Sequence, residues 1–487
     1  MFDDVDDDEL LRLGRASDDA DYLTEGLPET APSERLLTSL ADKGTAPLQR
    51  MAYRDQLLVK RRRFERQLGR LGLALQGLSA PTRDDESGAS LANSVVSSLE
   101  RVRASPTIRR FRNKAEYVVG RDESGEPKSV GHLTWMPLRL SSASQATRRP
   151  LYRVALHSDN VLTARPAYRR WALRFQEFIR QSDWKEAMPR KSDGVSRPSA
   201  FVGHYMQFRI RSTESGEVML LVVVNPDDDL TPEAIAREKA RLKDCVLAES
   251  RRSNLRVDSL GFQLCPTWRC GPDQAPVDIL HGVPYITETV VGRSYRVSPT
   301  AFFQTNAQAA KVLLDTVAEA GEFDPRKTTL LDVCSGTGVY SVGLADSVRR
   351  SIGIEVDRGA IEDAAVNCAE NGVRNARFVA GFAEKLIDRV INELSEEEEA
   401  GDLVVLLNPG RWGLGRDVVS AVRGCESVRR LLFVSCYLFQ RSFRNLFNLC
   451  RPPTPRYAGR PFGVKRTIPV DMFPHTRHCE LVVLLER

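Results

Sequence analysis

The sequence contains no apolar run long enough to cross a bilayer, and no CxxC pair that would indicate a zinc or iron–sulfur site. Its nine cysteines are scattered and odd in number, which is not the pattern of a disulfide framework. The first residues, MFDDVDDDELL, have neither the apolar core of a secretory signal nor the Arg-rich, acid-poor character of a mitochondrial presequence. We therefore expect no membrane span, no bound metal and a reducing compartment.

Length and charge indicate several domains. A chain of 487 residues exceeds a single hydrophobic core, so we expect two or three domains. The 70 Lys and Arg residues against 65 Asp and Glu give a net charge of only +5, but the basic residues cluster. We predict a disordered acidic tail over residues 1–35, a helical region with a linker over 36–104, a β-rich module over 105–297 and an α/β domain over 298–487.

The complete dinucleotide fingerprint GxGxxG is also absent. In the stretch Leu330–Tyr340, LLDVCSGTGVY, an apolar strand closed by Asp332 leads into a turn that holds Gly336 and Gly338. Ser341 occupies the position of the third glycine. The turn nevertheless has the composition of a nucleotide-binding loop between a buried strand and a helix.

A second apolar strand follows and ends in Glu355, where a ribose-binding acid stands in such folds. Strand, glycine turn, helix, strand and acid therefore occur in the order of a nucleotide site. Because the fingerprint is incomplete, we favour S-adenosylmethionine over a dinucleotide as the cofactor.

The last part of the chain alternates strands with helices. A helix capped by Asn306 runs to Ala320, and the alternation after it predicts a Rossmann-like, doubly wound α/β domain with a parallel sheet and helices on both faces. Ligands bind at the carboxyl ends of such strands. The predicted strands are Leu330–Val333, Ser351–Ile354, Ala376–Val379, Leu403–Leu407, Leu431–Ser435 and Leu481–Leu485.

Three features near these strand ends suggest chemistry. Cys436 follows the apolar run LLFVS and is a candidate nucleophile, although a cysteine that ends a buried strand is usually a packing residue. Glu480 opens the final apolar strand and is either a functional carboxylate or an exposed acid at a strand end. Residues 408–411, NPGR, resemble the tetrapeptide of amino-group methyltransferases, but Arg411 replaces the aromatic residue which N6-adenine or N4-cytosine methylation requires.

The N-terminal half supplies basic clusters. Residues 53–73 have the spacing of an amphipathic helix, with Arg62, Arg66 and Arg70 on the polar face, which is either a solvated surface or faces RNA. The alternating pattern between residues 105 and 300 predicts two hairpins, interrupted by helices. Its densest basic and aromatic cluster, in which bases could stack and phosphates be neutralised unless it is a plain surface strand, is Arg109, Arg110, Phe111, Arg112, Lys114 and Tyr117.

Taken together, six segments occur in the order found in the RNA uracil-5 methyltransferases: FRNKAEY, SPTAFFQTNAQAA, LLDVCSGTGVY with GIE, VVLLNPGRWGL, LFVSC and DMFPHTRHCELVVL. From about Arg35 to the C-terminus the sequence resembles this family, and most of all its animal homolog B members. The resemblance implies a class I S-adenosylmethionine-dependent methyltransferase domain, an RNA substrate that is tRNA or also rRNA, and 5-methyluridine as the product.

The resemblance also implies residue roles. It makes Cys436 of the SC motif the nucleophile and Glu480 of the FPHTxHxE motif the base that removes the C5 proton. Gln304 of FFQTN matches a cofactor-binding position, and Asn408 matches a position that contacts both cofactor and base. The predicted cofactor-binding residues are Gln304, Asp332, Gly336, Gly338, Glu355 and Asn408, and the predicted RNA-binding residues are Phe111, Arg112, Lys114 and Arg411.

Two departures keep an alternative open. Most members of the family have DPPR and SCNP where this chain has NPGR and SCYL, although homolog B members resemble it in both. The alternative is a catalytically weak or inactive RNA-binding or RNA-folding protein on the same scaffold; a small-molecule methyltransferase is disfavoured because the basic β module would have no purpose. The resemblance favours mitochondria, whereas the N-terminal composition leaves the cytosol or nucleus open.

Overall fold

The computed structural model describes residues 46–78, 88–122, 125–136, 151–155, 162–189, 201–271, 273–395, 401–410, 413–436, 438 and 441–487. The predicted acidic tail and Arg411 lie outside the described residues. Within the parts of the chain that are described, every helix is too short or too polar to span a membrane.

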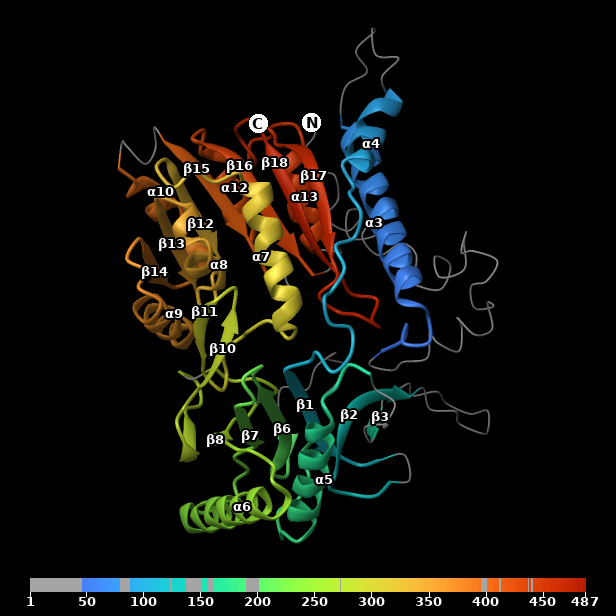
Figure 1. Ribbon diagram of the computed structural model, residues 1–487, viewed down its shortest axis with the longest axis vertical. Helices are drawn as coiled ribbons and strands as arrows, with labels where there is room; N and C mark the ends of the chain where they lie inside the picture. Colours follow the sequence, from blue (N-terminus) through green and yellow to red (C-terminus); the bar gives the residue numbers. More distant parts are fainter. Residues whose placement is uncertain are drawn as a thin grey trace. The chain divides into compact units, whose positions relative to one another are not determined.

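The chain forms two compact units (Figure 1). The first unit contains residues 1–108, 290–295 and 306–487, and the second contains residues 109–289 and 296–305. The described part of the N-terminal helical region therefore shares a unit with the C-terminal α/β region.

A seven-stranded sheet with the strand order β14-β13-β12-β15-β16-β18-β17 forms the centre of the first unit. The five strands β12 to β16 are parallel, which confirms the predicted Rossmann-like α/β fold. The strands are β12 (Thr328–Val333), β13 (Arg350–Glu355), β14 (Ala376–Ala380), β15 (Asp402–Leu407), β16 (Val428–Ser435), β17 (Gly463–Val470) and β18 (Glu480–Glu486).

The prediction of an all-parallel sheet was wrong at one edge. Strand β18 runs antiparallel to both β16 and β17, and β17 was not predicted. The connection between them, residues 471–479, is too short for the crossover that parallel strands require. The sequence of β17, GVKRTIPV, hides the strand because it contains charged residues and Pro469, which are tolerated at a sheet edge.

Helices cover both faces of this sheet, as predicted. Helix α7 (Ala307–Gly321) begins at the predicted cap, where the Asn306 side chain accepts a hydrogen bond from the Ala309 N–H, and it packs on β16, β17 and β18 (Figure 1). The other α-helices in the described residues of this region are α8 (Val339–Gly343), α9 (Arg358–Glu370), α10 (Ala383–Asn392), α12 (Arg416–Gly424) and α13 (Arg441–Cys450).

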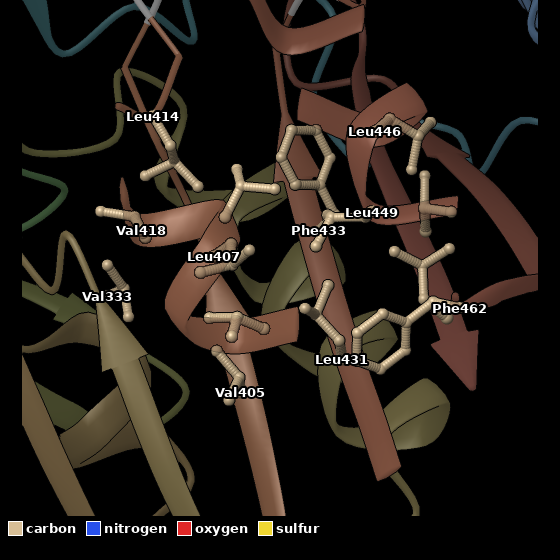
Figure 2. Packing of buried hydrophobic residues seen from close by; sticks show 14 of the residues in the cluster. Val333, Val405, Leu407, Leu414, Val418, Leu431, Phe433, Leu446, Leu449 and Phe462 are labelled. Carbon is tan, nitrogen blue, oxygen red and sulfur yellow. The ribbon is translucent and has the colours of Figure 1, made fainter. Parts of the chain in front are cut away.

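The core on one face of the sheet is continuous with the N-terminal helices. Figure 2 shows Leu431 and Phe433 of β16 beside Leu446 and Leu449 of α13. The same buried cluster includes one side of α3 (Tyr53–Gln76), and α4 (Gly88–Ser97) packs against α3. The apolar residues of α3 that join the cluster are Phe64, Leu68, Leu71 and Leu75, so the predicted amphipathic helix buries its apolar face against the C-terminal region.

The second unit is a β-rich module, as its alternating sequence predicted. Its larger sheet has the order β3-β2-β1-β6-β7-β8-β9, and the two predicted hairpins are the pairs β1–β2 and β6–β7. The strands of this sheet are β1 (Lys114–Gly120), β2 (Ser129–Met136), β3 (Leu151–Ala155), β6 (Tyr205–Ser212), β7 (Val218–Val224), β8 (Ser259–Leu264) and β9 (Val277–Gly282), and β4 (Met188–Pro189) and β5 (Phe201–Val202) form a separate pair. The residues of a further pair, β10 (Ile286–Val290) and β11 (Arg293–Val297), are divided between the two units.

Helices α5 (Pro166–Arg180) and α6 (Pro232–Ser253) share the aromatic-rich core of this module. Thr231 caps α6 through its side chain, as its position before Pro232 predicted. One feature was not predicted: Cys265 and Cys270 form a disulfide, whereas the other seven cysteines are free.

Candidate active site

The glycine turn after β12 combines two glycines with different surroundings. Gly336 and Gly338 have positive φ angles of 56° and 80°. A Cβ at Gly338 would lie 3.0 Å from the Phe378 ring, whereas a Cβ at Gly336 would meet no atom within 4 Å. Gly338 is therefore required for packing, while the space beside Gly336 is open to a ligand.

Asp332 lies beneath this turn. It is fully buried, and it accepts a 2.8 Å hydrogen bond from the Ser341 hydroxyl, which in turn accepts one from Ser351 at 2.9 Å. Burial raises the pKa of Asp332 from 3.8 to about 7, against the lowering effect of Ser341. Asp332 thus braces the residue that occupies the missing third glycine position.

Glu355, at the end of β13, holds the turn from the other side. Its Oε2 accepts a 3.0 Å hydrogen bond from the Gly336 N–H, and its Oε1 accepts bonds from the N–H groups of Val356 and Asp357 at 2.8 and 3.0 Å. The predicted acid and the predicted turn are therefore in direct contact.

Two exposed apolar side chains follow the ends of the neighbouring strands. Val356 is 51% exposed and Phe382 is 59% exposed. The two strand ends lie side by side, because Glu355 pairs with Ala380 and the Gly381 N–H donates a 2.7 Å hydrogen bond to the Glu355 carbonyl. Neither residue was predicted from the sequence; an apolar residue directly after the ribose-type acid was the available signal.

Cys436 and Glu480 both lie at the carboxyl ends of the parallel strands, because β18 runs antiparallel to β16. Ser435, the last residue of β16, pairs with Leu481, the second residue of β18. Cys436 therefore follows one partner and Glu480 precedes the other, which places them at adjacent positions. Cys436 is half-buried and Glu480 is only 6% exposed.

The glycine turn and Asn408 also lie at the carboxyl ends of the parallel strands. Asn408 follows β15, and its N–H donates a 3.2 Å bond to the carbonyl of Val333 at the end of β12. Tyr340 is buried, and burial, then the charges of Glu480 and Asp332, raise its pKa well above the ordinary value. Tyr340 thus lies in the electrostatic field of both the proposed base and the carboxyl beneath the turn, a connection which the sequence did not predict.

Most other free thiols have environments that keep them protonated. Burial is the first cause of a raised pKa in five of them, to about 12 for Cys334 and Cys450 and to about 11 for Cys368. Since the thiolate is the nucleophilic form, these positions are poor nucleophiles. The five cysteines are Cys245, Cys334, Cys368, Cys450 and Cys479.

Known proteins similar to this chain identify its family. A family model described as tRNA (Uracil-5-)-methyltransferase matches residues 279–487. The chain is 33% identical over 458 residues to the human tRNA (uracil-5-)-methyltransferase homolog B, covering 92% of this chain and 84% of that protein. The chain belongs to the tRNA (uracil-5-)-methyltransferase family.

A second relative extends the likeness over nearly the whole chain. The mouse tRNA (uracil-5-)-methyltransferase homolog A is 33% identical over 486 residues, which cover 98% of this chain and 73% of that protein. The crystal structure of Pyrococcus abyssi tRNA (uracil-54, C5)-methyltransferase in complex with S-adenosyl-L-homocysteine has the same fold, with a TM-score of 0.53 and 20% identity over 90% of this chain and 85% of that chain. The protein is an RNA methyltransferase, and S-adenosylmethionine is its methyl donor.

In this methyltransferase Gln304 belongs to the second unit. Its side chain is 9% exposed, and its backbone carbonyl accepts a 3.0 Å bond from the Asn113 side chain, which also bonds to Glu288 at 3.2 Å. Asn113, in the FRNKAEY motif, was not among the predicted site residues. Through this hydrogen bond, Asn113 connects the FRNKAEY motif to the FFQTN motif.

Part of the predicted RNA-binding cluster is buried, although Arg109 and Arg110 are exposed. Phe111 is only 5% exposed, so its ring is not presented for stacking. Lys114 lies 2.7 Å from Glu116, and burial, then Arg211, lower its pKa to about 8. Arg112 is half-buried, and its N–H donates a 3.0 Å bond to the Thr163 carbonyl.

Two arginines on the neighbouring strand β6 were not predicted as part of this basic cluster. In the register of β1 and β6, Lys114 lies opposite Arg211 and Glu116 opposite Arg209. The charged residues alternate with apolar ones in YMQFRIRS, which was the signal for a common face. On α3, Arg62, Arg66 and Arg70 are half-buried and engaged in interactions, so they do not form a bare basic stripe.

Among the described residues, one group of side chains has metal-ligand composition: His204, Asp227 and Asp229. The His204 Nδ1 accepts a 3.0 Å bond from the Lys185 N–H, so the ring proton is on Nε2, which donates to Asp229 at 2.7 Å. Both ring nitrogens are therefore occupied by hydrogen bonds, and the cluster is explained without an ion.

Proposed function

We propose that this protein methylates C5 of uridine in RNA, with tRNA as its main substrate, and that Cys436 and Glu480 carry out the covalent chemistry. The observation that supports it best is the antiparallel pairing of Ser435 with Leu481, which brings a thiol and a carboxyl to adjacent positions beside the glycine turn. Few other types of reaction require a thiol and a carboxyl together beside a nucleotide-binding loop.

The chemistry of uracil requires these two groups. C5 is a weak nucleophile, so the thiolate of Cys436 adds to C6, the C5–C6 π electrons move to C5 and the O4 enolate, and C5 becomes nucleophilic. When bound, S-adenosylmethionine would supply the methyl group to C5 and would leave as S-adenosylhomocysteine. Glu480 then accepts the C5 proton, the C5–C6 double bond re-forms, and the bond from C6 to the Cys436 sulfur breaks, which frees the enzyme.

The residues around the glycine turn fit S-adenosylmethionine. The open space beside Gly336 would admit the cofactor close to the backbone, and Glu355 would bind its ribose hydroxyls. Val356 and Phe382 would cover the faces of its adenine, which explains why two large apolar side chains are exposed at this edge. Asp332 and Gly338 would act indirectly by shaping the turn.

The remaining predicted residues complete the proposal. Gln304 would contact the cofactor, and Asn408 would hydrogen-bond the pyrimidine edge, whereas Arg411 would neutralise phosphate or enolate charge. Arg112 and Lys114 would contact RNA, with Phe111 supporting the segment from within. A base within folded RNA must be flipped out to reach Cys436, and the β-rich module would hold the strand around it. Ribosomal RNA is a second candidate substrate.

Methyl transfer from labelled S-adenosylmethionine to unmodified tRNA tests this function. We expect the wild-type protein to transfer label, and Cys436→Ala to bind tRNA with wild-type affinity but transfer none. Cys245→Ala, which removes another half-buried free thiol, is the matched control and should keep full activity. Full turnover by Cys436→Ala would overturn the mechanism, and a wild-type protein that binds and anneals RNA without labelling it would favour the RNA-folding alternative.

A further inference from the structure

Helix α3 carries a polar stripe that is buried. Tyr53, Gln56, Lys60 and Arg63 are separated by three, four and three residues, so they lie on one face of the helix. Gln56 is 0% exposed and Lys60 is 1% exposed. Buried polar side chains in a helix require specific partners, because an unsatisfied group would destabilise the fold.

All four side chains bond to the connection between β17 and β18, residues 471–479, which leads directly into Glu480. The Lys60 ammonium lies 2.5 Å from the Asp471 carboxylate, both side chains being fully buried, and it donates a second bond to the Phe473 carbonyl at 3.0 Å. The Tyr53 hydroxyl donates to the other Asp471 oxygen at 2.9 Å. Farther along the helix, Arg63 donates to the Arg477 carbonyl at 3.1 Å.

Gln56 holds the middle of the connection. Its Oε1 accepts a 2.8 Å bond from the His475 N–H, and its Nε2 lies 3.1 Å from the His475 Nδ1 while donating to the Met51 carbonyl at 2.9 Å. An amide NH₂ can only donate, so Nδ1 is the acceptor and the ring is the neutral Nε2–H tautomer. The Leu48 N–H adds a 2.9 Å bond to the His475 carbonyl.

These hydrogen bonds stabilise a backbone conformation that is unfavourable for a histidine. His475 has a φ of 67°, in the left-handed region that favours glycine. Such a conformation persists only where its surroundings determine it, and here Gln56 binds both the backbone and the ring. The path of residues 475–480, and with it the position of the Glu480 carboxylate, therefore depends on α3.

We propose that Gln56 and Lys60 are positioning residues for Glu480: the buried stripe of α3 fixes the β17–β18 connection so that the carboxylate meets the C5 proton. This proposal rests on the proposed function. It assigns the N-terminal helix a role in one chemical step, proton removal from the covalent intermediate, rather than in RNA binding.

Gln56→Leu tests the proposal, because it keeps the side-chain size but removes the bonds to His475. We expect kcat to fall on the order of 100-fold, as for a misplacement of about 1 Å, with KM for tRNA and S-adenosylmethionine within about twofold of wild type. A covalent RNA adduct should accumulate on a denaturing gel, since the thiol adds normally but the proton is not removed. Leu73→Ala, at a 63% exposed position of the same helix, is the matched control and should keep wild-type kcat.

Three outcomes would overturn the inference. They are an unchanged kcat in folded Gln56→Leu, a lower kcat without a covalent adduct, and a raised KM with unchanged kcat. If Gln56→Leu does not fold, Lys60→Arg keeps the charge opposite Asp471 while displacing the connection, and the same adduct is expected; its absence would contradict the proposal. Glu480→Gln run in parallel separates the two claims. If Glu480→Gln traps no adduct, the proposed function fails, whereas an adduct with Glu480→Gln but with neither α3 variant rejects only the positioning role.

Discussion

At the scale of single residues, the site combines side chains that act directly with side chains that shape the backbone. Glu355 accepts three backbone hydrogen bonds around the glycine turn, and Asp332 braces Ser341 beneath it. The sequence predicted both acids from their positions at strand ends. It did not predict that Asp332 is fully buried, because the packing of α8 and of β13 over that carboxyl depends on the tertiary fold.

The raised pKa of Asp332 predicts a pH-dependent stability difference. Its pKa rises from 3.8 to about 7, so the folded protein keeps the proton in this window while the unfolded chain releases it. The group therefore destabilises the fold increasingly as pH rises from 4 to 7, by roughly 4 kcal/mol at most. The melting temperature of Asp332→Asn relative to wild type should therefore rise between pH 4 and pH 7 and level off above it, measured by differential scanning calorimetry. A Tm difference that is constant with pH would contradict the assignment.

Phe382 provides a residue-scale test of the cofactor site. Since its ring is 59% exposed, Phe382→Ala should change the stability by no more than about 0.5 kcal/mol. Loss of the proposed contact with adenine should weaken S-adenosylmethionine binding by about tenfold, measured by isothermal titration calorimetry. Val283→Ala, at another exposed apolar position, is the control. Unchanged affinity in Phe382→Ala would place the adenine elsewhere.

At the scale of elements, periodicity predicted most of the helices and parallel strands, and it failed where charge or proline interrupted the pattern. Strand β17 was missed because Lys465, Arg466 and Pro469 conceal an edge strand. That omission hid the antiparallel hairpin which brings Glu480 to Cys436. The motif likeness predicted the pair, but sequence periodicity could not supply the reversal of strand direction that explains it.

The packing of α3 predicts a large effect of a small truncation. Leu68 is fully buried in the cluster that α3 shares with the C-terminal sheet. Leu68→Ala should destabilise the protein by about 2–5 kcal/mol, since it leaves a cavity between the helix and the core. Chemical denaturation followed by circular dichroism measures the difference. An effect as small as that expected for the exposed Leu73→Ala would show that α3 is not part of this core.

At the scale of the whole molecule, each of the two units is built from segments that are not contiguous in the sequence, so the motifs do not fall into the units in chain order. The FRNKAEY and FFQTN segments meet in the second unit through Asn113 and Gln304, whereas the glycine turn, Cys436 and Glu480 belong to the first. Composition predicted a β-rich module and an α/β domain. It could not predict that residues near the N-terminus would pack on the last hairpin, because contacts between residues more than 400 positions apart, such as Lys60 with Asp471, leave no local pattern.

The measurement that tests the central claim most directly is covalent trapping with Glu480→Gln. Incubated with S-adenosylmethionine and unmodified tRNA, this variant should add its Cys436 thiol to C6 of the uracil, and C5 of the uracil should then receive the methyl group. It should then stall, which gives a protein–RNA band on a denaturing gel that is absent from the double variant Cys436→Ala/Glu480→Gln. Wild-type turnover by Glu480→Gln without such a band, or a band that persists in the double variant, would contradict the account.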